Sequence, residues 1–112
     1  MQIQRLMVLF ILGLSLSAAA DFRTTMEVHE VELTHLRLPG STSGTLTFSD
    51  CTDCNALTIR ATAATRYIVN GKDVSLADFR RVVAGIRNRS DQIIDVYHDL
   101  ESDTVIRVNA KL

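Results

Sequence analysis

The sequence predicts an α+β fold, in which a small antiparallel and partly curled β-sheet, a roll or open barrel, carries one amphipathic helix packed on it. Three observations predict this fold. Stretches that alternate apolar and polar residues recur along most of the chain, as in half-buried strands. One stretch near the middle has apolar residues three and four apart, as on one face of a helix. The links between these stretches are short, which favours antiparallel neighbours.

The start of the chain has the composition of an export signal. Arg5 supplies a positive charge, residues 6–14 form a compact apolar run, and residues 17–20 are the small residues that a signal peptidase requires. We therefore expect a signal peptide over residues 1–20 that is cleaved after Ala20 or one residue earlier. The apolar run is shorter than the ~20 residues that cross a bilayer, so no membrane span is expected. The remainder, residues 21–112, is predicted to be a single small α+β domain.

The charge balance excludes one class of partner. The chain has 12 lysines and arginines against 13 aspartates and glutamates, and the two signs are interspersed. It has no tryptophan, and aromatic residues make up only 5% of the sequence. Since nucleic-acid binding uses clustered positive charge and stacking aromatic rings, no nucleic-acid partner is expected.

The first stretch of the domain, residues 24–38, is compatible with a helix and with a strand. Thr24 and Glu27 have the spacing of a capping box, and the apolar residues partly fit a helical stripe. We favour a strand over residues 28–38, because valine, threonine and leucine dominate it, with one change of face of the kind that a bulge produces. Residues 39–44, which are rich in glycine and serine, predict a loop.

Two strands are predicted next, over residues 45–48 and 57–63. The turn-forming residues 49–55 between them include both cysteines, so Cys51 and Cys54 are placed in the connection of a hairpin. The expected inward-facing side chains are Leu46, Phe48, Leu57, Ile59, Ala61 and Ala63.

The clearest local signals lie between residues 65 and 83. Asn70 and Gly71 predict a type I′ turn that joins a strand over residues 66–69 to a return strand over residues 72–74. Ser75 then predicts the N-cap of a helix of about twelve residues, which Gly85 weakens or ends. The expected apolar stripe of this helix is Leu76, Phe79, Val82, Val83 and Ile86.

The last part of the chain predicts a long hairpin. Residues 92–100 and 104–112 both alternate apolar and polar side chains and are joined by three turn formers. The expected inward faces are Ile94, Val96, His98 and Leu100 on the first strand, and Ile106, Val108, Ala110 and Leu112 on the second.

The two cysteines predict a small structural disulfide. An exported pair is expected to be oxidised. A redox pair requires its first thiol at a helix N-terminus, whereas strands flank this one and Asp50 and Asp53 disfavour a thiolate. Thiol exchange and metal binding are left as alternatives.

No cofactor or metal is expected, although weak candidate ligands exist. They are Cys51, Cys54, His29 and His35, with His98, Asp50 and Asp53 as further donors. The predominant interpretation of Glu27, His29 and His35 is a solvated strand face, and that of His98 is a half-buried, hydrogen-bonded side chain.

No catalytic residue is predicted. No nucleophile motif or phosphate-binding loop occurs, and Asp95 and Asp99 are interpreted as part of a solvated strand face. The sequence therefore favours an exported, small, soluble, non-enzymatic module that binds an unknown protein or small ligand in the cell envelope or outside the cell. The alternative is an accessory thiol-redox or metal-binding protein that uses Cys51 and Cys54.

Overall fold

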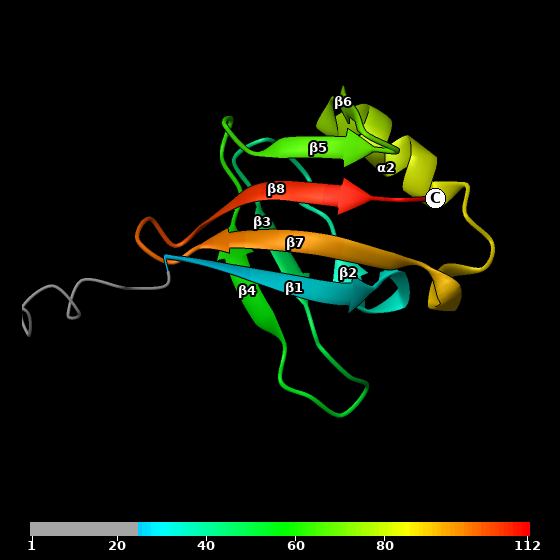
Figure 1. Cartoon of the computed structure of the whole chain (residues 1–112), viewed down its shortest axis with the longest axis horizontal. Coiled ribbons are helices and arrows are strands. Elements are labelled where there is room, and N and C mark those ends of the chain that lie inside the picture. The colour runs from blue at the N-terminus through cyan, green and yellow to red at the C-terminus, as the bar shows by residue number, and fades with distance from the viewer. Residues whose placement is uncertain (1–24) are drawn as a thin grey trace, which may run out of the picture.

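The computed structural model describes residues 25–112, so the predicted signal peptide and Thr24 lie outside the described residues. In this part of the chain, eight strands form one mixed sheet together with one α-helix and two 3-10 turns, which confirms the α+β class (Figure 1). The elements are β1 (Met26–Glu32), η2 (Leu33–His35), β2 (Leu36–Arg37), β3 (Thr45–Phe48), β4 (Leu57–Arg60), β5 (Arg66–Val69), β6 (Lys72–Val74), α2 (Leu76–Ala84), η3 (Arg89–Asp91), β7 (Ile93–Asp99) and β8 (Thr104–Ala110).

Strand β8 has partners along both of its edges. One edge pairs with β7 in the predicted hairpin, and the other edge is shared between β4 near its start and β5 along its second half. The strand order is β1-β7-β8-β4-β3-β2, with β5 and β6 branching from β8. The pairs of β8 with β4 and β5 are parallel, so the prediction of an antiparallel sheet is only partly right.

The parallel pairs arise from the connection between β4 and β5. Residues 61–65 bend the chain without reversing it, so β4 and β5 run in one direction past the same edge of β8. At this bend the buried Thr65 hydroxyl donates a hydrogen bond to the Val105 carbonyl oxygen (2.7 Å) and accepts one from the Thr62 amide (2.9 Å). The Thr65 side chain thus bonds to β8 in the gap between the residues that pair with β4 and those that pair with β5.

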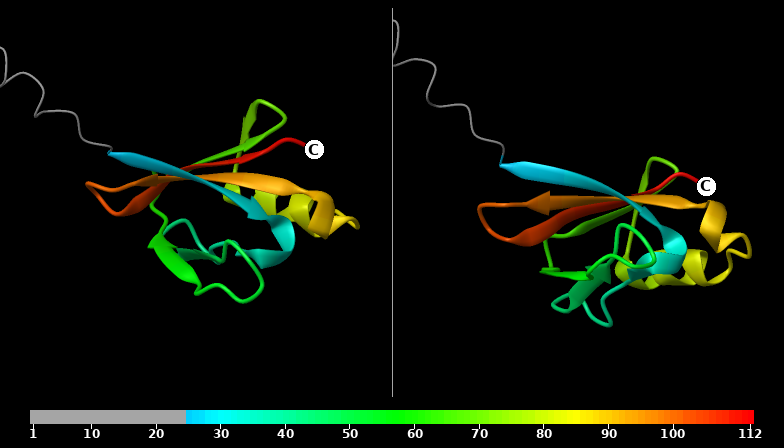
Figure 2. Two further views of the ribbon diagram at one scale, coloured as in Figure 1. Left: turned by 60° about the horizontal axis from the view of Figure 1, so that its bottom comes forward. Right: turned by 90° about the horizontal axis from the view of Figure 1, so that it is seen from below.

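The sheet is curled into two layers but is not closed. β4, β3 and β2 turn beneath β1, β7 and β8, and α2 lies in the same lower layer (Figure 2). The core between the layers consists mainly of Val31, Leu33, Leu46, Phe48, Ile59, Phe79, Ile94, Val96, Val105 and Val108.

A bulge in β8 corrects the predicted inward face of that strand. His98 is paired with Val105 while the preceding Tyr97 is paired with Arg107, so Ile106 is an extra residue. Val105 is therefore buried in place of Ile106. Other expected core residues lie at strand ends or on the outer side of α2 and are exposed, namely Leu57, Ala63, Val82, Leu100 and Leu112.

The first strand also differs from its prediction. β1 ends at Glu32, and the 3-10 turn η2 then leads into β2, which pairs with β3 and not with β7. The change of face expected from a bulge is thus made by a turn that moves the chain to the other layer. Whether the chain continues along β7 or turns to pair with β3 depends on which strands are available as partners, and the local sequence does not contain that information.

The central hairpin and helix are confirmed. Asn70 and Gly71 both have positive φ (50° and 84°), as a type I′ turn requires. The Ser75 hydroxyl accepts the amide hydrogen of Asp78, which caps a helix of nine residues that ends before Gly85. Arg89 donates to the Val83 carbonyl oxygen at 3.0 Å and so satisfies one of the last carbonyls of the helix.

Replacing Tyr67 with phenylalanine is expected to stabilise the protein. The Tyr67 ring packs on Phe79 with 5.5 Å between ring centroids, but its buried hydroxyl has no hydrogen-bond partner within the described residues. An unpaired buried polar group costs about 1–3 kcal/mol, so Tyr67→Phe should raise the free energy of unfolding by a similar amount in urea titrations. Tyr97→Phe is the control, because the Tyr97 ring faces Arg107 (4.2 Å from the centroid) at the surface. A clear loss of stability in Tyr67→Phe would contradict this account.

The same substitution is expected to reduce sensitivity to alkali. Burial raises the pKa of the Tyr67 hydroxyl above its usual value. Stability that depends on the neutral hydroxyl is therefore present below the unfolded-state pKa of about 10 and is lost as the pH rises through the folded-state pKa. The stability difference between Tyr67→Phe and the native protein should widen above about pH 10, as measured by urea titration at increasing pH.

Candidate functional site

Strand β1 lies at an open edge of the sheet. Its only strand partner among residues 25–112 is β7. The Thr25 carbonyl accepts from the Leu100 amide (2.8 Å) and the Leu33 amide donates to the Gln92 carbonyl (2.9 Å), so the odd-numbered residues of β1 bond to β7. By the alternation of an antiparallel ladder, the amides and carbonyls of Met26, Val28, Glu30 and Glu32 point away from the sheet.

The side chains along this edge combine apolar and acidic groups. Met26 and Val28 have 42% and 52% of their surface exposed, which is high for apolar residues in a strand. Glu27, Glu30 and Glu32 place three carboxylates on the same seven-residue strand. We refer to β1, with its outward backbone groups and these side chains, as the open edge.

The disulfide loop lies between β3 and β4. Cys51 and Cys54 are at bonding distance with 5.0 Å between their Cα atoms, and the Cys54 amide donates to the Cys51 carbonyl oxygen at 3.2 Å. The predicted pairing is therefore present, and a bonded sulfur does not act as a thiolate ligand. The loop approaches β1, because Asp50 Oδ1 lies 3.9 Å from His29 Nδ1.

Three candidate ligands meet beneath the open edge. Glu27 and His29 belong to one face of β1, and His98 lies directly across from Glu27 on β7. Ligand atoms of the three side chains all lie within 4.8 Å of one another. We call Glu27, His29 and His98 the histidine cluster.

The histidine cluster marks the transition from the core to solvent. The side chains of His29 and His98 are only 16% and 13% exposed, whereas that of Glu27 is 51% exposed. The His29 ring packs on Phe48 with 4.9 Å between centroids. His29 Nε2 lies 3.3 Å from Glu27 Oε2, but this contact does not have hydrogen-bond geometry. In the part of the chain that the structure describes, this buried nitrogen therefore has no hydrogen-bond partner.

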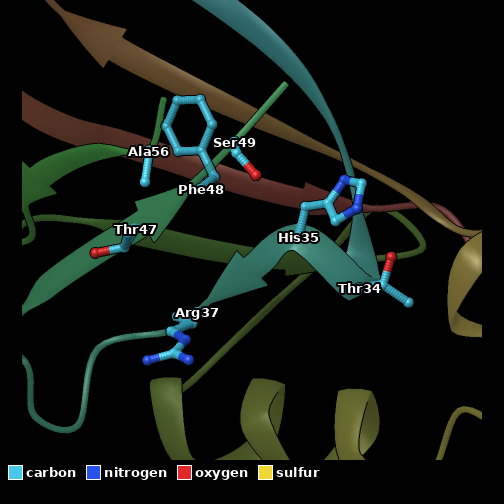
Figure 3. A pocket seen from close by; sticks show the side chains of 7 residues that line it. All are labelled: Thr34, His35, Arg37, Thr47, Phe48, Ser49 and Ala56. Atoms are coloured by element: carbon cyan, nitrogen blue, oxygen red, sulfur yellow. The ribbon is translucent and has the colours of Figure 1, made fainter. Parts of the chain in front are cut away.

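His35 lies apart from the cluster. The turn η2 carries it to a shallow hollow of about 380 Å³, where Thr34 and His35 line one end and Arg37 and Thr47 line the other (Figure 3). Its nearest carboxylate is Glu32, at 3.9 Å from His35 Nδ1. The structure therefore pairs His29 with His98 and not with His35.

The remaining acidic candidates have structural contacts. The Asp99 carboxylate accepts hydrogen bonds from the Glu101 amide and the Ser102 side chain, and these bonds lower its pKa. The same hydrogen bonds stabilise the turn between β7 and β8. Asp95 pairs with Glu30 across β1 and β7 and lies with it along a shallow surface hollow. Neither aspartate belongs to the histidine cluster.

The association of His98 with His29 was missed at the sequence level, although a signal existed. Both histidines continue the inward face of an alternating strand: His29 lies two residues before the buried Val31, and His98 lies two residues after the buried Val96. Recognising that they meet requires the pairing of β1 with β7, and residues 33–92 lie between those two strands in the sequence.

Comparisons with protein-family models, with curated proteins and with solved structures gave no significant match. Among residues 25–112, no helix is long and apolar enough to cross a membrane.

Removal of the disulfide is expected to have a modest effect. The bond closes a very small loop, and the entropy lost by the unfolded chain is correspondingly small. Replacing both Cys51 and Cys54 with serine should lower the free energy of unfolding by at most ~3 kcal/mol in urea titrations. Complete loss of folding by circular dichroism would contradict this expectation.

Proposed function

We propose that this protein is an exported, non-enzymatic binding module, and that the open edge takes up an extended segment of another protein as an additional strand. The observation that carries the proposal is the row of outward backbone groups on β1. An unpaired edge of this length is a template for strand addition, in which main-chain hydrogen bonds provide affinity.

The side chains of the open edge favour a positively charged partner segment. Glu27, Glu30 and Glu32 repel acidic chains and attract basic ones, while the exposed parts of Met26 and Val28 offer apolar contact. The same carboxylates disfavour pairing between two copies of β1. The expected partner is therefore a protein with an extended, basic segment.

The arrangement around His98 supports a binding role over catalysis. His98 Nε2 and Asp103 Oδ1 are 2.7 Å apart, a geometry that can orient a general base. A base needs a nucleophile or substrate group within hydrogen-bond reach. Among the described side chains, His98 has its hydrogen bond with Asp103 and none with a hydroxyl or thiol.

Export is supported by the composition of residues 1–20 and by the bonded cysteines, since disulfides persist in oxidising compartments.

Proline at position 28 is expected to block strand addition. The Val28 amide points away from β7, so Val28→Pro removes an outward donor while leaving the β1–β7 ladder intact. The probes are an eight-residue peptide that alternates lysine and valine and its glutamate–valine counterpart, each labelled for fluorescence anisotropy. We expect the lysine peptide to bind the native protein at least about tenfold more tightly than the glutamate peptide does. Val28→Pro should lower the affinity for the lysine peptide by about tenfold or more.

Val28→Thr is the matched control, because it keeps the amide and a β-branched side chain. Its affinity for the lysine peptide should remain close to that of the native protein. Amide exchange should also show new protection at Met26, Val28, Glu30 and Glu32 in the complex. Equal binding by the proline variant, or no binding of either peptide, would contradict the proposed mode.

The export signal can be tested separately. The full chain, expressed in a Gram-negative host, should reach the periplasm and begin at Asp21 or one residue earlier by mass spectrometry. Leu9→Arg, which places a charge in the apolar run, should leave the uncleaved chain in the cytoplasm. Cytoplasmic accumulation of the uncleaved native chain would contradict export.

A further inference from the structure

We propose that the histidine cluster is a binding site for a divalent transition-metal ion of the Zn²⁺ class, with Glu27, His29 and His98 as its protein ligands. The site is formed by the inward side chains of β1 and β7, whereas the proposed strand addition uses the outward backbone groups of β1. The Glu27 carboxylate is the one group that both proposals use, because it also adds negative charge to the open edge. The backbone hydrogen bonds of strand addition do not involve the cluster, so different variants test the two proposals.

The positions of the ligand atoms fit an ion after a small contraction. Zinc–nitrogen bonds of about 2.0–2.1 Å in tetrahedral geometry place ligand atoms roughly 3.4 Å apart. His29 Nε2 and Glu27 Oε2 are already 3.3 Å apart, and all three ligand atoms lie within 4.8 Å of one another. The Glu27 carboxylate is half exposed, so its side chain can rotate toward the two imidazoles without repacking of the core.

The buried nitrogen of His29 gives an independent reason to expect an ion. His29 Nε2 faces the cluster and has no hydrogen-bond partner among residues 25–112, although buried polar atoms are nearly always paired. A metal ion accepts the lone pair of a neutral imidazole and removes this penalty. The packing of the His29 ring against Phe48 holds the nitrogen in place.

Both histidines also have a carboxylate outside the cluster. Asp103 is hydrogen-bonded to one ring nitrogen of His98 at 2.7 Å, and Asp50 lies 3.9 Å from the second ring nitrogen of His29. Metal-ligating histidines commonly hydrogen-bond to a carboxylate as His98 does to Asp103, which fixes the ring and makes the ligating nitrogen more basic. Asp50 lies beyond hydrogen-bond distance of His29 and acts on that ring through its charge. Asp50 is supplied by the disulfide loop, so the bond between Cys51 and Cys54 supports the site from outside.

The donor set selects the class of ion. Two imidazoles and one carboxylate suit Zn²⁺, Co²⁺, Ni²⁺ and Cu²⁺, whereas Ca²⁺ and Mg²⁺ require oxygen ligands. Three protein ligands leave a fourth position, which opens toward solvent on the side of the exposed Glu27. A water molecule or a donor group from another molecule can occupy that position.

The test uses untagged protein produced from the full chain, because a histidine tag would itself bind metal. Native protein is titrated with Zn²⁺ in competition with a chromogenic chelator, and with Co²⁺ followed by its visible absorption. We expect one ion per chain, tetrahedral Co²⁺ bands that Zn²⁺ removes, and no competition from millimolar Ca²⁺. His29→Gln, His98→Gln and Glu27→Gln should each weaken Zn²⁺ binding by about tenfold or more.

His35→Gln is the matched control. His35 also has a buried nitrogen without a hydrogen-bond partner and a nearby carboxylate, and its side chain is 22% exposed against 16% for His29. This variant should bind Zn²⁺ as tightly as native protein. Circular dichroism checks the fold of each variant, and the half-exposed Glu27→Gln remains informative if a histidine variant unfolds. Stoichiometric binding that survives in His29→Gln and Glu27→Gln, or no stoichiometric binding by native protein, would overturn the proposal.

Asp103→Asn separates a positioning role from a ligand role. Asp103 has positive φ (54°), which asparagine tolerates, so the turn should be retained. We expect this variant to bind Zn²⁺ less tightly while its Co²⁺ spectrum keeps the tetrahedral bands of the native site. Loss of those bands would make Asp103 a ligand in place of Glu27 or His98 and would contradict the assigned set.

Discussion

The structure depends on the double use of strand β8. One edge of β8 pairs with β7, and the other edge pairs in parallel first with the end of β4, at Arg60, and then with all four residues of β5. The Thr65 side chain bonds to β8 where the two strands separate, and the extra residue Ile106 bends β8 at the same level. β4 is therefore free to pair with β3 in the lower layer, while β5 stays in the upper one and leads into the helix.

Within residues 25–112, this arrangement leaves β1 with β7 as its single strand neighbour. β7 has β8 on one side and β1 on the other, and β2 continues from β1 only after a 3-10 turn into the lower layer. The curled sheet thus stays open between its two end strands, β1 and β2. The free backbone edge and the meeting of His29 with Phe48 are both consequences of that opening.

Polarity changes steadily along the inner face of β1. Val31 is fully buried, His29 is mostly buried and Glu27 is half exposed. On the partner strand β7, the inner face likewise changes from the buried, apolar Ile94 to the partly exposed, polar His98. Imidazole rings suit this position, because they pack on Phe48 and still present nitrogen atoms to polar neighbours. The core of the fold and the candidate site are therefore two ends of one continuous surface.

The sequence by itself determined the features that depend on neighbouring residues. The turn at Asn70 and Gly71, the helix cap at Ser75 and the pairing of Cys51 with Cys54 follow from φ preferences, side-chain hydrogen bonding and short separation, and the structure has all three. Only the tertiary structure decided the parallel partners of β8, the burial of Val105 in place of Ile106, and the proximity of His29 to His98. These features depend on which distant strands pair and in which register, and an alternating pattern is equally compatible with several partners because it specifies a face and not a neighbour.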